Sequence, residues 1–142
     1  MSFLGKKSWG KDKTKSADSN DWVYLGETDN YAVYYKSSSV EIDHQNNIIG
    51  VVTQHMFSDE GKIDFLNRLT DVDRQKHIDI NHSLLLYYFK YEERKYVISK
   101  LTDYSKLGDI IYDCDYPLVW KKITPDTLED YLLNKLFQGH HI

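Results

Sequence analysis

The sequence predicts an α+β domain: an antiparallel β-sheet of about six to seven strands, with a short inserted helix and a C-terminal helix packed on the sheet. Three observations predict this class. The stretch from Leu84 to Tyr104 is aromatic and aliphatic on both sides of a short charged segment, 92–95, as in a long β-hairpin. Twelve tyrosines in 142 residues favour strands. Residues 124–139 instead repeat leucine at helical spacing.

The other strands are predicted from short alternating segments bounded by polar turns. The folded part begins near Trp22, and Gly50 marks a bulge or a close approach within a long strand. The expected strands, besides the hairpin, are 22–25, 31–36, 40–43, 48–57, 109–113 and 118–123. The domain is therefore expected to span residues 21–138, between a disordered polar tail, 1–20, and a short tail, 139–142.

Two helices are predicted from apolar residues that recur every three or four positions. Ile63, Leu66 and Leu69 place the inserted helix within 58–71, followed by a charged connection at 71–75. In the C-terminal helix, Thr124 is expected as the N-cap, Pro125 as the first helical residue and Gly139 as the end. One stripe of this helix carries Leu128, Leu132 and Leu136, which we expect to pack on the sheet.

Composition narrows the possible partners and compartments. The net charge is −4, so a basic face for nucleic acid is not expected. No apolar run approaches the ~18 residues of a transmembrane helix, so no membrane span is expected. The N-terminus lacks the apolar core of a signal peptide, which predicts a cytoplasmic protein unless a leader was removed. The single cysteine excludes an internal disulfide.

No catalytic, cofactor-binding or metal-binding residue is assigned from the sequence, and no small-molecule substrate is identified. The histidines have no zinc-type spacing, and there is no glycine-rich phosphate loop. Cys114 lies between Asp113 and Asp115, whose negative charges disfavour a reactive thiolate, so a catalytic cysteine is not expected. The sequence leaves open whether the fold brings dispersed histidines together, namely His44, His55, His77 and His82.

Tyrosine side chains are the candidate binding residues. Tyr31, Tyr34 and Tyr35 fall in the predicted strand 31–36, which carries no proline or lysine run to protect it as a sheet edge. Tyrosine offers a large contact area with few torsions to restrict. The sequence therefore predicts binding of a protein partner, or of a second copy of the chain, through a sheet edge or a tyrosine-bearing face.

Several landmarks between Trp22 and Phe137 follow a family pattern. They are the Trp-led strand at Trp22, the strand end Tyr34–Tyr35–Lys36–Ser37–Ser38, Tyr104 before the Gly108 turn, and Trp120, Ile123, Pro125 and Thr127 at the last helix. In these features the chain resembles the bacterial surface-adhesin protein E family. The resemblance implies an antiparallel sheet crossed by a C-terminal helix, adhesive binding, and a cell-envelope or secreted location if a leader was removed. Phe89 and Phe137 stand near the positions where family members often carry cysteines, and the N-terminal residues do not match the leader that is usual in the family.

Three classes of function follow. The first is a non-catalytic protein-binding module resembling a cell-envelope adhesin. The second is a cytoplasmic structural or regulatory module that self-associates. The third is a small enzyme with a histidine site assembled by the fold. Function belongs to sites rather than to folds, so the choice depends on where the side chains lie.

Overall fold

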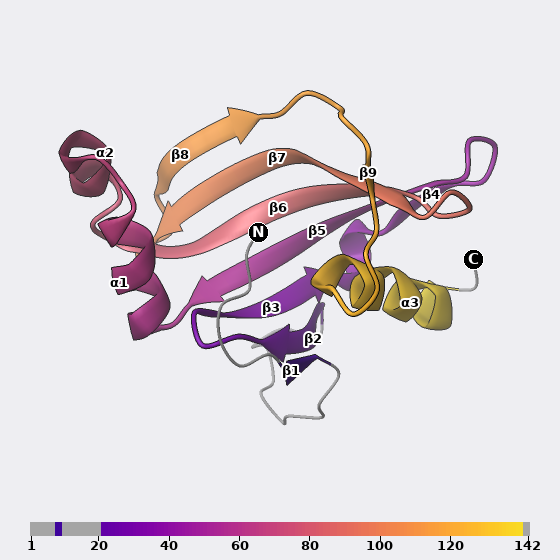
Figure 1. The fold of residues 1–142 in the computed structure, drawn as a ribbon, viewed down its shortest axis with the longest axis horizontal. Coiled ribbons are helices and arrows are strands. Elements are labelled where there is room, and N and C mark those ends of the chain that lie inside the picture. Colours follow the sequence, from indigo (N-terminus) through magenta and orange to yellow (C-terminus); the bar gives the residue numbers. More distant parts are fainter. Residues whose placement is uncertain (1–7, 10–20, 141–142) are drawn as a thin grey trace.

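The computed structural model describes residues 8–9 and 21–140, and it shows an α+β fold (Figure 1). Within these residues the strands are β1 (Ser8–Trp9), β2 (Trp22–Glu27), β3 (Tyr31–Lys36), β4 (Glu41–Asp43), β5 (Ile48–Phe57), β6 (Ile80–Lys90), β7 (Lys95–Ser105), β8 (Ile110–Asp115) and β9 (Lys121–Lys122). The helices are the 3-10 turn η1 (Ser37–Ser39), α1 (Asp59–Asn67), α2 (Asp71–Lys76) and α3 (Leu128–His140). The predicted tail 1–20 lies outside the described residues except for Ser8–Trp9.

All strand pairs are antiparallel and form one sheet. The main order is β1-β2-β3-β5-β6-β7-β8, while β4 also pairs with β5 and β9 also pairs with β7. The predicted hairpin is β6–β7, from the Ile80↔Ser105 pair to the Lys90↔Lys95 pair at its turn. Figure 1 shows α1 and α2 at one end of this curved sheet and α3 at the other. The predicted fold class is confirmed.

The core lies between one face of the sheet and α3. Alternate residues of β6, such as Leu85 and Tyr87, are buried, whereas the residues between them are only half-buried. Val51 of β5, which lies opposite Tyr87, is fully buried on the same face. From α3 the core receives Leu128, Leu132, Leu133 and Leu136, each fully buried. The Tyr87 hydroxyl donates a hydrogen bond of 2.9 Å to Glu129 of α3. The predicted leucine stripe therefore attaches α3 to the sheet.

The segment predicted as a charged connection, 71–75, is instead the helix α2. The Thr70 hydroxyl accepts a hydrogen bond of 3.3 Å from the Asp73 backbone N–H, as an N-cap does. Asp71 and Asp73 lie in the first turn, and Arg74 and Lys76 lie in the last turn. Charges in this order interact favourably with the helix dipole and so stabilise the helix, even though α2 has no buried residue.

The C-terminal helix begins later than predicted. Asp126 has a positive φ of 64°, which interrupts helical backbone after Pro125. The cap is Thr127, whose hydroxyl accepts a hydrogen bond of 3.3 Å from the Asp130 N–H, so the assignment of Thr124 as N-cap was wrong. The helix also continues past Gly139 to His140. The predicted strand 118–123 is reduced to β9, which is Lys121–Lys122.

Strand β3 is an interior strand, so the prediction that 31–36 could serve as a sheet edge was wrong. It pairs with β2 through Tyr34↔Tyr24 and with β5 through Tyr35↔Thr53. The paired residues Tyr35 and Thr53 are eighteen positions apart in the sequence, because η1 and β4 lie between β3 and β5. The backbone groups of β3 are thus used on both sides, and an edge must be sought elsewhere.

Helix α1 is fixed against the β2–β3 turn at Gly61. Ser58 caps the helix by accepting a hydrogen bond from Gly61 N–H (3.0 Å), and its hydroxyl donates to the Asp29 carbonyl (2.6 Å). A Cβ on Gly61 would lie 1.8 Å from the backbone oxygen of Asn30, closer than any real contact. The turn and the helix must therefore separate if any side chain is placed here.

We expect Gly61→Ala to lower the free energy of unfolding by about 1–3 kcal/mol, because the added methyl group would clash with the backbone of Asn30. Chemical denaturation measures the loss. Gly139→Ala is the control, because its Cβ would lie 3.7 Å from the Tyr35 hydroxyl, an ordinary contact. Equal stability of wild type and Gly61→Ala would contradict the docked position of α1.

Candidate functional site

A row of side chains crosses the core face near α1 and α2. In the strand register, His55 of β5 lies opposite Ser83 of β6, Ser83 lies opposite Asp103 of β7, and Asp103 lies opposite Tyr112 of β8. Directly opposed residues of antiparallel strands project to the same face. These four residues therefore form one row across four strands. We call this set, His55–Ser83–Asp103–Tyr112, the polar row.

Asp103 is the centre of the hydrogen bonds in the polar row. The Ser83 hydroxyl donates to its Oδ1 at 2.5 Å, and Nε2 of His77 lies 3.4 Å from its Oδ2. Burial raises the pKa of the Asp103 carboxyl, against the opposing effects of Ser83 and His77. The other ring nitrogen of His77 lies 2.8 Å from the Asp73 carbonyl oxygen. The row is thereby connected to the end of α2.

His55 is buried and uncharged. Only 3% of the residue is exposed, and burial lowers the pKa of its imidazole to about 3. Its Nε2 has no hydrogen-bond partner among the described residues. The Tyr31 ring lies 5.1 Å from the imidazole, centroid to centroid, and covers it on the β3 side. A buried polar atom without a partner is rare in proteins, so this position needs an explanation.

A cavity of about 560 Å³ opens above the polar row. Its floor includes His55, Ser83 and Asp103, and its walls carry Phe57, Phe65 and Leu69. Phe65 belongs to α1, and its ring lies 5.4 Å from Phe57 and 5.6 Å from His77. The cavity therefore depends on the position of α1 and of the α1–α2 link.

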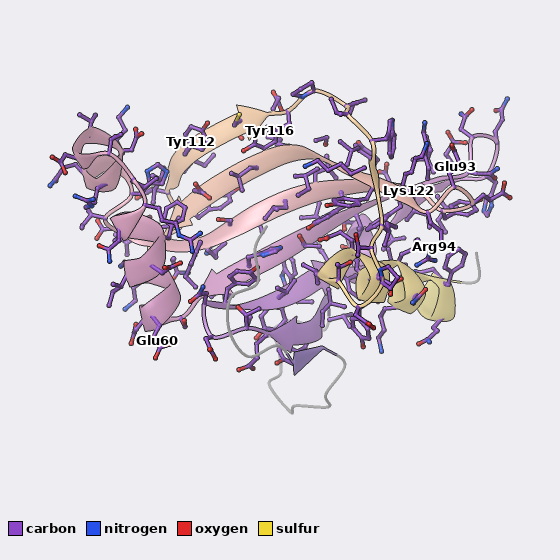
Figure 2. The ribbon with its side chains drawn as sticks, in the orientation of Figure 1. Glu60, Glu93, Arg94, Tyr112, Tyr116 and Lys122 are labelled. Atoms are coloured by element: carbon purple, nitrogen blue, oxygen red, sulfur yellow. The ribbon has the colours of Figure 1, made fainter. Side chains whose placement is uncertain are left out.

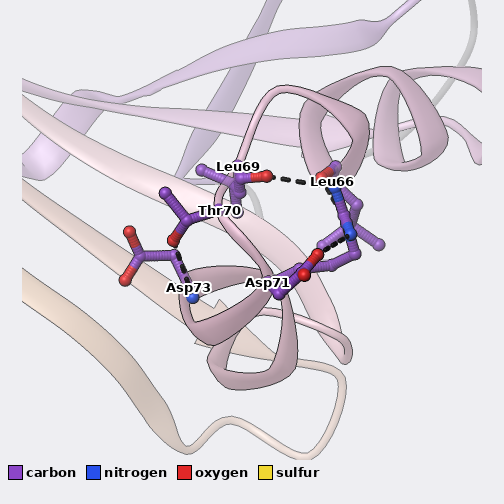
Figure 3. A network of polar contacts seen from close by, with 6 residues as sticks. Leu66, Leu69, Thr70, Asp71 and Asp73 are labelled. Atoms are coloured by element: carbon purple, nitrogen blue, oxygen red, sulfur yellow. Dashed lines mark hydrogen bonds and ion pairs between the residues drawn. The ribbon is translucent and has the colours of Figure 1, made fainter.

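The α1–α2 link is held by Arg74. Its Nε donates to the Leu66 carbonyl at 2.9 Å and its Nη2 to the Leu69 carbonyl at 3.0 Å, while Nη1 pairs with Asp71 at 2.8 Å. Figure 3 shows this network, with Leu66, Leu69 and Asp71 converging at the junction of the two helices. These carbonyls lie at the C-terminal end of α1, where intrahelical partners are lacking. One arginine thus fixes the wall that Leu69 contributes.

A second cavity, of about 360 Å³, lies on the same face toward α3. The two cavities share Leu85 and Leu101, and the second is lined on its α3 side by Glu129. Burial raises the pKa of Glu129, which accepts the hydrogen bond from Tyr87. This carboxyl is therefore used inside the core.

The three predicted binding tyrosines are divided between the two faces. Tyr35 is only 4% exposed and belongs to the core, so it cannot contact a partner. Tyr31 is half-buried beside His55, on the core face. Tyr34 is half-buried on the other face, with its ring 5.5 Å from that of Tyr24. The three do not form one surface.

The dispersed histidines converge only in part. His55 belongs to the polar row and His77 contacts the row through Asp103. His82 instead projects from the opposite face, where its ring stacks on that of Tyr104 at 5.0 Å. His44 is exposed in the turn after β4. Within residues 8–9 and 21–140, no group of three or more His, Cys, Asp or Glu residues could hold a metal ion. Ser83 donates to Asp103 rather than to a histidine, so the arrangement lacks the serine–histidine pair of an activated nucleophile.

The sequence predicted a strand at 109–113, which is β8, but it did not predict the polar row or the position of β8 at the end of the strand order. Ser83 and Asp103 interrupt apolar strands, but their pairing depends on a register that the single sequence does not state. Large apolar side chains are exposed along residues 107–119, namely Leu107, Ile110, Tyr112, Tyr116, Leu118 and Val119. We call this set the β8 margin. The available signal was the run of apolar residues in 110–119, which was interpreted as two ordinary strands.

The chain was compared with known proteins. No protein-family model matches it, and no curated protein matches it either. The helices among the described residues are too short or too polar to cross a membrane. The β8 margin and the cavity over the polar row are therefore the two candidate binding sites.

Proposed function

We propose that the protein is a non-catalytic protein-binding module that adds an extended strand of a partner protein to the outer edge of β8. The observation that carries the proposal is that β8 pairs with β7 on one side, while no described strand pairs with its other side. An unpaired strand edge is a template for another strand. The resemblance of residues 22–137 to the surface-adhesin protein E family supports the same class of function.

The free edge has backbone donors available for pairing. The Tyr116 N–H donates to the Ser99 carbonyl of β7 at 2.9 Å. This bond identifies which residues of β8 direct their backbone groups toward β7. Alternate residues of an antiparallel strand turn their backbone groups to opposite sides. The N–H groups of Asp113 and Asp115 therefore point away from β7, toward an incoming strand.

The side chains of the β8 margin are suited to a protein partner. Tyr112 is 43% exposed and Tyr116 is 42% exposed. Figure 2 shows these two tyrosines at the outer strand of the sheet, with Tyr112 on β8 and Tyr116 just beyond it. Aromatic side chains of this kind are common at the energetic centres of protein interfaces.

The charges of β8 favour a basic partner over a second copy of the chain. Asp113 and Asp115 alternate with other residues along β8, so their side chains lie on the same face of the sheet. The ammonium group of Lys100 lies 3.7 Å from the Asp113 carboxylate. If two β8 strands paired antiparallel, these aspartates would oppose each other, and directly opposed like charges destabilise a sheet. We therefore infer a partner strand in which apolar residues alternate with lysine or arginine.

Designed peptides test the proposal. We expect an extended peptide of alternating valine and lysine to bind, and the matched valine–glutamate peptide to bind at least tenfold more weakly, in fluorescence-polarisation titrations. Changing both Asp113 and Asp115 to lysine should reverse this preference.

Backbone pairing is tested separately at Asp113. Asp113→Pro removes an outward N–H without removing a backbone hydrogen bond to β7, which an edge strand tolerates. It also removes the side-chain contacts of Asp113 with Thr102 and Lys100 of β7. Its control, Asp113→Ala, removes the same charge and keeps the N–H. We expect Asp113→Pro to bind the basic peptide more weakly than Asp113→Ala does. Equal binding by these variants would rule out strand addition at β8, and dimerisation on dilution-series light scattering would favour the self-associating module instead.

A further inference from the structure

We propose that the cavity above the polar row is a binding site for a small uncharged amphiphile, with its apolar body between α1 and the sheet and its hydroxyl group bonded to the imidazole of His55. This site lies on the core face, whereas the proposed strand addition uses the outer backbone edge of β8. Tyr112 belongs both to the cavity lining and to the β8 margin, so the two proposals are tested with different probes and variants.

The cavity has the size and lining of a small-molecule site. Its volume of about 560 Å³ accommodates a molecule of one or two rings. The apolar part of the lining comes from separate elements that converge here: Phe57 of β5, Leu85 of β6, Leu101 of β7, Phe65 of α1 and Leu69 of the link. Such a lining favours an apolar ligand body through the burial of its surface.

His55 is the polar anchor of this site. It lines the cavity, and only 3% of the residue is exposed. Its Nε2 has no hydrogen-bond partner among the described residues. The other polar groups on the floor are engaged, because Ser83 donates to Asp103 and His77 is paired with Asp103. A ligand hydroxyl can donate or accept, so it can pair with either tautomer of the neutral imidazole.

The surrounding charges favour an uncharged ligand. A carboxylate would approach Asp103, and the arginine of the wall, Arg68, is already paired with Asp64 at 2.8 Å. An ammonium would lose its hydration in an apolar cavity whose buried carboxylate already has two partners. A neutral group that makes one hydrogen bond avoids both costs.

The test uses the full chain and three matched probes: benzyl alcohol, toluene and benzoate. Each is titrated while the ring ¹⁵N and ¹H signals of the histidines are followed by NMR. We expect benzyl alcohol and toluene to bind, with a change of the His55 signals for benzyl alcohol, and we expect benzoate to bind most weakly.

Variants separate the hydrogen bond from the cavity. In His55→Phe, the affinity ratio of benzyl alcohol to toluene should fall by roughly three- to tenfold, the contribution of one neutral hydrogen bond. His82→Phe is the matched control, since His82 lies on the opposite face, and it should leave the ratio unchanged. Leu69→Trp should weaken both probes by filling the cavity.

Two outcomes would overturn the proposal. The first is an affinity ratio that is the same in wild type and in His55→Phe, because His55 then makes no hydrogen bond to the ligand. The second is undiminished binding by a folded Leu69→Trp variant, because the probes then bind elsewhere. Asp113→Pro should bind all three probes as wild type does, which distinguishes this site from the β8 edge.

Discussion

Leu132→Ala is expected to lower the free energy of unfolding by about 2–5 kcal/mol, the range for deleting most of a fully buried leucine side chain. Leu132 has no exposed surface and lies in the row of α3 residues that contact the sheet core. The loss combines the transfer of the deleted methyl groups with the cavity that remains. Urea denaturation followed by tryptophan fluorescence measures it.

Asn134→Ala is the control on the same helix, because Asn134 is exposed and alanine favours helical structure. It should change stability by no more than about 0.5 kcal/mol. A loss of that small size in Leu132→Ala would mean that α3 does not cover the core in solution.

His55→Phe is expected to remove a large part of the acid sensitivity of the fold. The imidazole pKa is about 3 in the folded protein against 6.5 as the ordinary value, so the unfolded chain binds the proton more readily. Stability then falls as the pH decreases from 6.5 toward 3. Between about pH 7 and pH 4.5, wild type should lose about 2–3 kcal/mol more than His55→Phe does, at roughly 1.4 kcal/mol for each pKa unit.

Other groups have the opposite sign and are present in both proteins. Burial raises the pKa of Asp103 and of Glu129, so their protonation favours the folded state as the pH falls. The comparison of wild type with His55→Phe isolates the imidazole, which faces Tyr31 and Ser83. Urea denaturation across this pH range measures the difference, with His44→Phe as control because His44 is exposed in the turn after β4. Parallel pH profiles for wild type and His55→Phe would contradict the buried, neutral state of His55.

Local patterns were sufficient to predict the sheet and the last helix. The hairpin β6–β7 follows from dense apolar alternation on either side of 91–94, and α3 follows from leucines at helical spacing. In each case, the residues that indicate the element lie within a few positions of one another. Helix α2 was missed because it buries nothing, so no periodicity marks it, and only the Thr70 cap and the order of its charges indicate it.

The candidate sites depend on longer distances along the chain. Tyr35 and Tyr34 are neighbours with equal chemistry, yet Tyr35 is buried because β3 has strands on both sides and α3 over one face. Ser83 and Asp103 are twenty residues apart and meet only through the β6–β7 register. A register slip of one residue would turn each to the opposite face, so the polar row could not be predicted without knowing the pairing.

The strand order has a consequence for how the chain reaches its fold. From β5 to β8, each strand pairs with the strand that precedes it in the sequence, so the sheet can grow one hairpin at a time from local contacts. Helix α3 is the last described element, and it alone supplies the leucines that cover Tyr87 and Val51. During synthesis, the sheet therefore emerges with its apolar face open until residues 128–140 leave the ribosome. We expect the nascent chain to be most prone to aggregation in that interval, because the apolar face of the sheet is then uncovered.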